Sequence, residues 1–148
     1  MNTTVGAREV TTVVLLNADR EKVFAAWTRP EQLALWWGPR GFKNTFEQFE
    51  PKPGGDWKFV MHGPDGTDYA NHNVFREVLP NERIVLEHSG FPPFVLTATF
   101  EDAGGQTRFT FHQEFPTKEV FDQVKGYCVD GNEQNIERLQ ALLAKLYP

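Results

Sequence analysis

The side chains of this sequence that could act as nucleophiles have no catalytic context. Ser89 is the only serine, and its His-Ser-Gly surroundings lack the glycine-x-serine-x-glycine motif of many hydrolases. Cys128 is the only cysteine, which excludes an internal disulfide and a thiolate zinc cluster. Because Cys128 falls near the apolar stripe of an expected helix, we predict that it packs rather than reacts.

The histidines offer a candidate for proton transfer but no metal site. The sequence has four histidines: His62, His72, His88 and His112. No two of them form an i,i+4 pair, and none has an acidic residue at metal-ligand spacing. On the strand pairing expected below, His62 and His72 lie about 13 Å apart, too far for two ligands of one ion. No glycine-rich turn has the spacing of a phosphate-binding loop. We therefore predict no metal and no cofactor, and we take Tyr69 and His88 as catalytic candidates. The alternative for His88 is a structural role at a strand end.

Charge and hydropathy count against several classes of protein. The 15 basic and 20 acidic residues give a net charge of −5, so we expect no nucleic-acid partner. The longest apolar run, 23–27, is far too short to span a membrane, and residues 1–10 lack the pattern of a signal peptide. A cytoplasmic location is therefore expected. The 13 Phe, 4 Trp and 3 Tyr could fill a core or line a small-molecule cavity.

Alternating and β-branched residues, separated by turn signals, predict an antiparallel sheet of about six to seven strands. The expected strands are 8–16, 43–50, 56–62, 68–78, 83–88, 94–101 and 106–115. Two short helices should follow the first strand. Asp19 is the expected cap of the first, whose apolar stripe holds Val23, Phe24 and Trp27. The capping-box spacing from Thr28 to Glu31 predicts the start of the second.

A long helix is expected at the C-terminus, over about 117–146. Its apolar stripe includes Ile136 and Leu139, and it is the only element long enough to cover a sheet. Gly126 and Gly131 lie inside it, at a cost of about 1 kcal/mol each relative to alanine. They indicate either a close approach of the helix to the sheet or a kink. We predict one α+β domain over 1–148, a curved sheet around this helix.

Alternation also assigns the inner face of the sheet. If the turn at 63–67 closes a hairpin, Met61 lies opposite Tyr69 and Phe59 opposite Asn71. The inner face is then mainly apolar with a few polar points, which is the composition of a ligand pocket. The alternative is that each polar group satisfies a buried neighbour or a trapped water. The predicted cavity lining is Trp57, Phe59, Met61, Tyr69, Asn71, Asn73, Phe75, His88, Phe100, Phe111, Gln113, Tyr127, Asn135 and Leu139.

A series of short motifs resembles a known family. In chain order they are VFAAWT at 23–28, Pro30-Glu31, WWGP at 36–39, PGG at 53–55 before Trp57, HGPDG at 62–66, FREV at 75–78, ERIV at 82–85, and a stretch over 131–143 that contains ERL. From about residue 8 to 146 the sequence resembles the activator-of-heat-shock-ATPase-like family, within the START and polyketide-cyclase superfamily. This resemblance implies a helix-grip fold, with a cavity between the sheet and the long helix.

The resemblance implies three kinds of function, because family members bind hydrophobic or aromatic small molecules, act as cyclases or aromatases, or stimulate a heat-shock chaperone. We expect small-molecule binding first and a cyclase or aromatase second. The third alternative is a protein-interaction module, either a homodimer or a chaperone partner, which exposed Trp36 or Trp37 would favour. The eukaryotic activators carry an additional N-terminal domain for chaperone binding, whereas only residues 1–7 precede the first expected strand here. Many relatives have tryptophan after the helix glycine, where this sequence has Asn132.

Overall fold

The computed structural model describes residues 1–148, which form eight strands and three helices. In chain order the elements are β1 (Asn2–Val5), β2 (Glu9–Leu16), α1 (Arg20–Thr28), α2 (Pro30–Trp36), β3 (Lys43–Phe49), β4 (Asp56–His62), β5 (Asp68–Leu79), β6 (Arg83–Ser89), β7 (Phe94–Asp102), β8 (Thr107–Glu114) and α3 (Lys118–Leu146).

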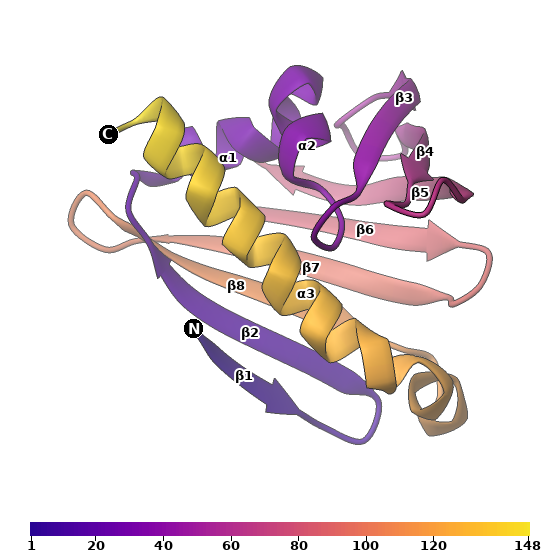
Figure 1. The fold of residues 1–148 in the computed structure, drawn as a ribbon. Helices are drawn as coiled ribbons and strands as arrows, with labels where there is room; N and C mark the ends of the chain where they lie inside the picture. Colours follow the sequence, from indigo (N-terminus) through magenta and orange to yellow (C-terminus); the bar gives the residue numbers. More distant parts are fainter.

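All eight strands belong to one antiparallel sheet in the order β1-β2-β8-β7-β6-β5-β4-β3. The long helix α3 lies across one face of this curved sheet, and α1 and α2 pack beside its C-terminal part (Figure 1). The predicted α+β helix-grip architecture is confirmed. The hairpin register is also confirmed, since Met61 pairs with Tyr69 and Phe59 with Asn71.

The sheet has eight strands, whereas six to seven were predicted. β1 was not expected, and it pairs with the edge of β2 so that Thr3 lies opposite Thr12. Its short sequence, Asn-Thr-Thr-Val, lacks the apolar alternation that identified the other strands, because most of its residues are exposed. The two short helices consequently follow the second strand rather than the first.

The two short helices begin in different ways. The Asp19 carboxylate accepts a hydrogen bond from the Lys22 backbone N–H at 3.0 Å, so the predicted cap of α1 is confirmed. The predicted capping box of α2 is wrong, because Arg29 is its N-cap and makes no side-chain cap bond. The Thr28 hydroxyl instead donates to the Phe24 carbonyl oxygen, 3.0 Å away within α1.

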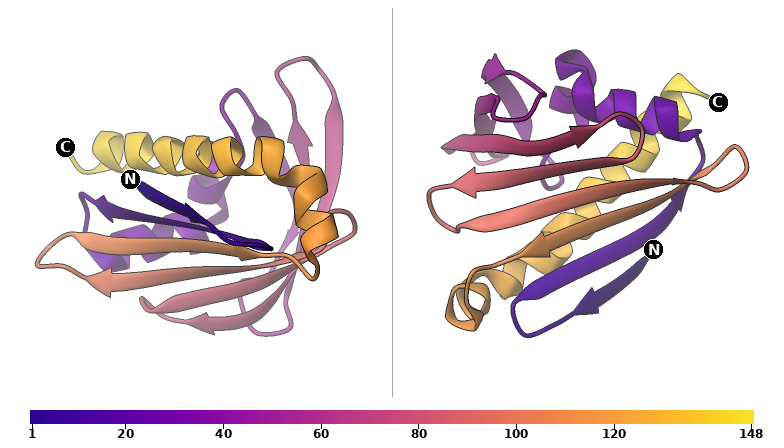
Figure 2. Two further views of the ribbon diagram at one scale, coloured as in Figure 1. Left: turned by 90° about the horizontal axis from the view of Figure 1, so that it is seen from below. Right: turned by 180° about the vertical axis from the view of Figure 1, so that it is seen from behind.

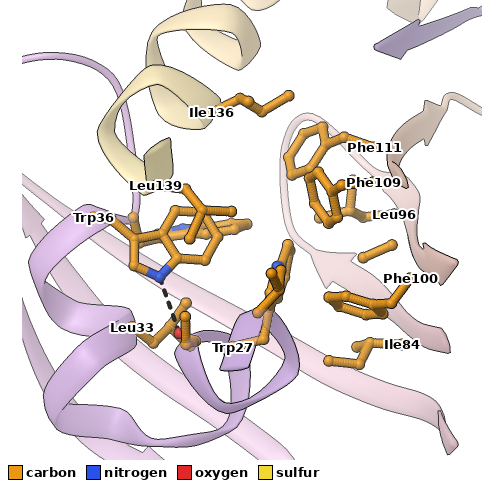
Figure 3. Close-up of a cluster of buried hydrophobic side chains, with 14 of the residues drawn as sticks. Trp27, Leu33, Trp36, Ile84, Leu96, Phe100, Phe109, Phe111, Ile136 and Leu139 are labelled. Carbon is orange, nitrogen blue, oxygen red and sulfur yellow. Dashed lines mark hydrogen bonds between the residues drawn. The ribbon is translucent and has the colours of Figure 1, made fainter. Parts of the chain in front are cut away.

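Three tryptophans from α1, α2 and the residue that follows α2 fill the space beneath the C-terminal half of α3. Trp27, Trp36 and Trp37 pack edge to face with one another, at ring-centroid separations of 5.1 to 5.6 Å. The Trp36 indole N–H donates to the Ala26 carbonyl oxygen at 2.9 Å, and Leu139 of α3 closes the cluster from above (Figure 3). Trp36 and Trp37 are both buried, so they do not form the exposed tryptophan surface that would favour a protein-interaction module.

Helix α3 is continuous but changes direction. Its first turns run at an angle to the rest of the helix, over the far end of the sheet (Figure 2). A Cβ at Gly126 would meet no atom within 4 Å, so no close approach of helix and sheet explains this glycine. At Gly131 a Cβ would lie 3.8 Å from Pro39 Cγ, which is ordinary contact. The glycines therefore accompany a bend rather than a tight crossing. No helix in the fold is both long enough and apolar enough to cross a membrane.

Candidate ligand-binding cavity

An open cavity of about 720 Å³ lies between the sheet and the first half of α3. Its walls come from strands β4 to β8, the loop between β6 and β7, the loop between α2 and β3, and α3 itself. Of the 25 residues that line it, 13 are hydrophobic, and none is an aspartate, glutamate, lysine or arginine. The cavity is therefore an uncharged space with isolated polar groups.

Most of the residues predicted to line a cavity do surround this one. Strands β4 and β5 present them in register, because Phe59 pairs with Asn71 and Met61 with Tyr69 on the same face. Tyr69 and Tyr127 are the exposed members, at 47% and 62% of their surface, and lie at the rim. The predicted residues that line the cavity are Phe59, Met61, Tyr69, Asn71, Asn73, His88, Phe111, Gln113, Tyr127 and Asn135.

Four predicted lining residues lie outside the cavity lining: Trp57, Phe75, Phe100 and Leu139. All four are buried in the core cluster, with no more than 2% of their surface exposed. They face the side that alternation predicts, but aromatic rings from α1, α2 and the α2–β3 loop occupy the adjoining space. The Trp37 ring centroid lies 5.0 Å from that of Trp57. These four residues therefore pack the core beside the cavity.

The residues that the sequence analysis missed come mainly from loops and from the helix. The α2–β3 loop contributes Trp37, Gly38, Pro39 and Phe42. The end of β6 and the loop that follows it contribute 89–92. Strand alternation carries no information about such loops. Cys128 packs against a second small core, as predicted, and it also lines the cavity. Burial raises the pKa of its thiol to about 11, so it remains protonated and unreactive near neutral pH.

The main polar group on the cavity floor is a His88–Asn73 pair. The two residues face each other across β5 and β6, and His88 Nδ1 lies 2.8 Å from Asn73 Oδ1. The imidazole also stacks on the Phe94 ring, with centroids 4.8 Å apart and planes inclined by 6°. Burial, with a smaller contribution from the charge of His72, lowers the pKa of His88 below that of an ordinary histidine. The ring is therefore held in one orientation and in its neutral form at pH 7.

The helix wall carries amides that are engaged with the opposite wall. The Asn132 amide donates to the Gln113 side-chain oxygen at 2.9 Å, and Asn135 Oδ1 accepts the Gly38 backbone N–H at 3.0 Å. These contacts link α3 to β8 and to the α2–β3 loop. Asn132, which follows the helix glycine Gly131, is thus a polar residue on the cavity wall.

Arg138 holds the α2–β3 loop against α3. Its guanidinium donates to five backbone carbonyl oxygens at 2.9 to 3.0 Å, those of Leu35, Trp37, Gly38, Pro39 and Phe42. No carboxylate pairs with this guanidinium, and its partial burial lowers its pKa. Since four of those five residues line the cavity, Arg138 is a positioning residue for one of its walls.

One group of side chains with metal-ligating atoms lies on the other face of the sheet. His112 Nε2 is 3.5 Å from a Glu9 carboxylate oxygen and 3.9 Å from one of Glu114. Its members come from the paired strands β2 and β8, so spacing along the sequence could not reveal it. Arg8 forms an ion pair with Glu114 at 2.9 Å, and Thr11 Oγ1 lies 2.8 Å from His112 Nδ1. With these partners, the group is a partly exposed cluster of polar contacts between β2, β8 and Arg8.

Comparison with solved structures identifies the same fold in three other organisms. A solution NMR structure from Arthrobacter aurescens is 24% identical, covers 97% of this chain and 91% of that chain, and has a TM-score of 0.91. A crystal structure from Rhodobacter sphaeroides is 24% identical over 98% of each chain, with a TM-score of 0.86. One from Mycobacterium smegmatis is 23% identical over 97% of this chain and 96% of that chain, with a TM-score of 0.85. At these identities the likeness concerns the fold.

The comparison of sequences places the chain in a family. No curated protein matches it. The profile of the family described as activator of Hsp90 ATPase homolog 1-like protein matches residues 17–144, which extends from the end of β2 almost to the end of α3. This match agrees with the resemblance of its motifs. The chain therefore belongs to the family of activator of Hsp90 ATPase homolog 1-like proteins.

Proposed function

We propose that this protein binds a hydrophobic or aromatic small molecule in the cavity between the sheet and α3. The observation that carries the proposal is the cavity itself, about 720 Å³ in volume and lined mainly by apolar side chains. Small-molecule sites usually have volumes of about 300 to 1,000 Å³ and a few oriented polar groups. The START-like fold of the family supports the same function.

The proposal can be tested with N-phenyl-1-naphthylamine, an uncharged dye whose fluorescence rises in apolar surroundings. A Gly131→Phe variant adds a side chain at the cavity wall, and replacing the glycine also favours the helix. Gly126→Phe is the matched control, since it lies in the same helix and outside the lining. We expect Gly131→Phe to weaken dye binding at least tenfold, about 1.4 kcal/mol, and Gly126→Phe to leave it within twofold.

Two results would contradict the proposal. One is that the wild-type protein does not bind the dye at micromolar concentrations. The other is that both glycine variants weaken binding equally, which would place the dye elsewhere on the protein. Circular dichroism of both variants checks that the fold is retained.

A second candidate function is proton transfer in the same cavity, and the His88–Asn73 pair favours it. A neutral imidazole with an oriented ring is the form in which histidine acts as a general base. A cyclase or aromatase that uses this base would lose at least tenfold in turnover in His88→Ala, about 1.4 kcal/mol in barrier. Tyr69→Phe tests the other candidate at the rim. Turnover that is unchanged in both variants would remove these roles.

The family description also names ATPase activation of a chaperone. The feature that would favour an interaction module here is an exposed tryptophan surface, but Trp36 and Trp37 are buried. We therefore do not propose chaperone activation, or a homodimer through these residues, as the function of this chain.

A further inference from the structure

The charge of the cavity restricts what it can accept. None of its lining side chains is a carboxylate, a lysine or an arginine. A ligand carboxylate or ammonium would lose its water in this space without gaining an opposite charge, and such desolvation is costly. The cavity therefore selects against ionised ligands, fatty acids included.

The polarity of the cavity floor follows from the contact between His88 and Asn73. Asn73 Oδ1 is a carbonyl oxygen and can only accept, so the hydrogen in the 2.8 Å contact belongs to His88 Nδ1. In a neutral imidazole the other ring nitrogen, Nε2, is then an acceptor. Nε2 of His88 has no hydrogen-bond partner in the protein, and His88 lines the cavity. The floor thus presents an unused acceptor.

Aromatic side chains form a large part of the lining of the cavity in which this acceptor lies. The imidazole stacks on Phe94, and Phe59, Phe111 and Trp37 also line the cavity. Rings packed among aromatic side chains gain from offset or edge-to-face contacts. An aromatic ligand with a donor group at one end fits both the shape and the polarity of the site.

We infer that the cavity selects an uncharged aromatic compound whose hydroxyl group donates a hydrogen bond to Nε2 of His88. This inference rests on the proposed function and adds the chemical class of the ligand and the group that recognises it. Asn73 is a positioning residue, because it acts through the tautomer and orientation of the imidazole.

Three probes of similar size test the inference: 2-naphthol, 2-methoxynaphthalene and 2-naphthoate. They differ in carrying a donor, an acceptor only, or an ionised carboxylate at pH 7.5. We expect wild-type protein, in fluorescence titrations, to bind 2-naphthol at least tenfold more tightly than either of the others. In His88→Phe, which keeps a flat ring on Phe94, the preference for 2-naphthol over 2-methoxynaphthalene should fall below twofold. His72→Phe is the matched control, since His72 is a neighbouring histidine outside the lining, and it should keep the preference.

A measurement on the wild-type protein is independent of how His88→Phe folds. The nitrogen-15 resonance of His88 Nε2 reports acceptance of a hydrogen bond, so it should move upfield with 2-naphthol and stay in place with 2-methoxynaphthalene. An unchanged resonance with bound 2-naphthol would overturn the inference.

The outcomes separate the inference from the proposed function. Binding of all three probes with equal affinity, or tightest binding of 2-naphthoate, overturns the inference and leaves a ligand-binding cavity. A hydroxyl preference that persists in His88→Phe overturns the assignment to His88. If none of these probes and no N-phenyl-1-naphthylamine binds, the proposed function itself fails.

Discussion

Arg138 provides the sharpest test of how the cavity is built. Its guanidinium is the only side-chain group of α3 that donates to carbonyl oxygens of the α2–β3 loop. It reaches four of them and also the Leu35 carbonyl oxygen at the end of α2. We expect Arg138→Met, which keeps an unbranched apolar stem of similar shape, to destabilise the protein and loosen this wall of the cavity.

The magnitude follows from the number of protons that the guanidinium can donate. Nη1 and Nη2 carry two hydrogens each, so the five contacts share four hydrogens. At a net value of about 1 kcal/mol for each hydrogen bond, the contacts contribute about 4 kcal/mol. Two effects offset part of this contribution. Without the side chain, the partly exposed carbonyl oxygens can bind water, and the desolvation of the guanidinium, which lowers the pKa of Arg138, no longer opposes folding. We therefore expect a loss of about 2 to 4 kcal/mol in the free energy of unfolding.

Urea unfolding at pH 7.5 measures this change, with the m-value as a check that the transition stays two-state. Arg138→Lys keeps the charge but offers a single donor atom, so it should lose most of the same stability. Arg40→Met is the matched control. Arg40 lies in the same loop, and its exposed pair with Glu137 spans 3.5 Å, so we expect a change below about 0.5 kcal/mol. A loss below 0.5 kcal/mol in Arg138→Met, or an equal loss in Arg40→Met, would refute this account of the loop.

Two further predictions concern titratable groups of the cavity. Burial raises the pKa of the Cys128 thiol from the ordinary value of 9.0 to about 11, so at pH 8 the folded protein holds about a hundredfold less thiolate. Because iodoacetamide reacts with the thiolate, it should alkylate Cys128 about a hundredfold more slowly in folded protein than in protein unfolded with guanidinium. Mass spectrometry measures both rates, and rates within tenfold would contradict the prediction. For His88, the unfolded chain binds a proton more readily than the folded one, so the free energy of unfolding should fall as the pH drops through about 6.5. The fall between pH 7.5 and 5.5 should be smaller in His88→Gln, which keeps the other histidines, and equal falls would show that His88 does not contribute.

The strands and their pairing could be predicted because the connections are short and carry strong turn signals. The turn at 63–67 fixes the β4–β5 hairpin, and the observed register follows from it. What could not be predicted are features without a periodic signal. One is β1, a short polar edge strand. The other is the start of α2, because the sequence does not show that the Thr28 hydroxyl donates back to the Phe24 carbonyl oxygen of α1 instead of capping α2.

Alternation predicted the faces of the sheet but not the border between core and cavity. Phe59 and Trp57 lie on the same face of β4, and only Phe59 lines the cavity. The difference arises because Trp37 packs against Trp57 from the α2–β3 loop, whose position the strand pattern does not determine. The His88–Asn73 pair depends likewise on the β5–β6 register, which shifts at a bulge after Phe75.

The size of the residues along α3 explains why one half of the interior is filled and the other is open. Its C-terminal half presents Ile136, Leu139 and Leu143, which are buried against the tryptophan cluster. Its first half presents smaller or polar residues to the cavity, among them Cys128, Gly131 and Asn132. The helix thus lies across one face of the sheet and leaves an open space beneath part of its first half. A single helix can therefore provide both the stability of a packed core and an open space, and exchanging a small residue for a large one in its first half should close the space without unfolding the protein.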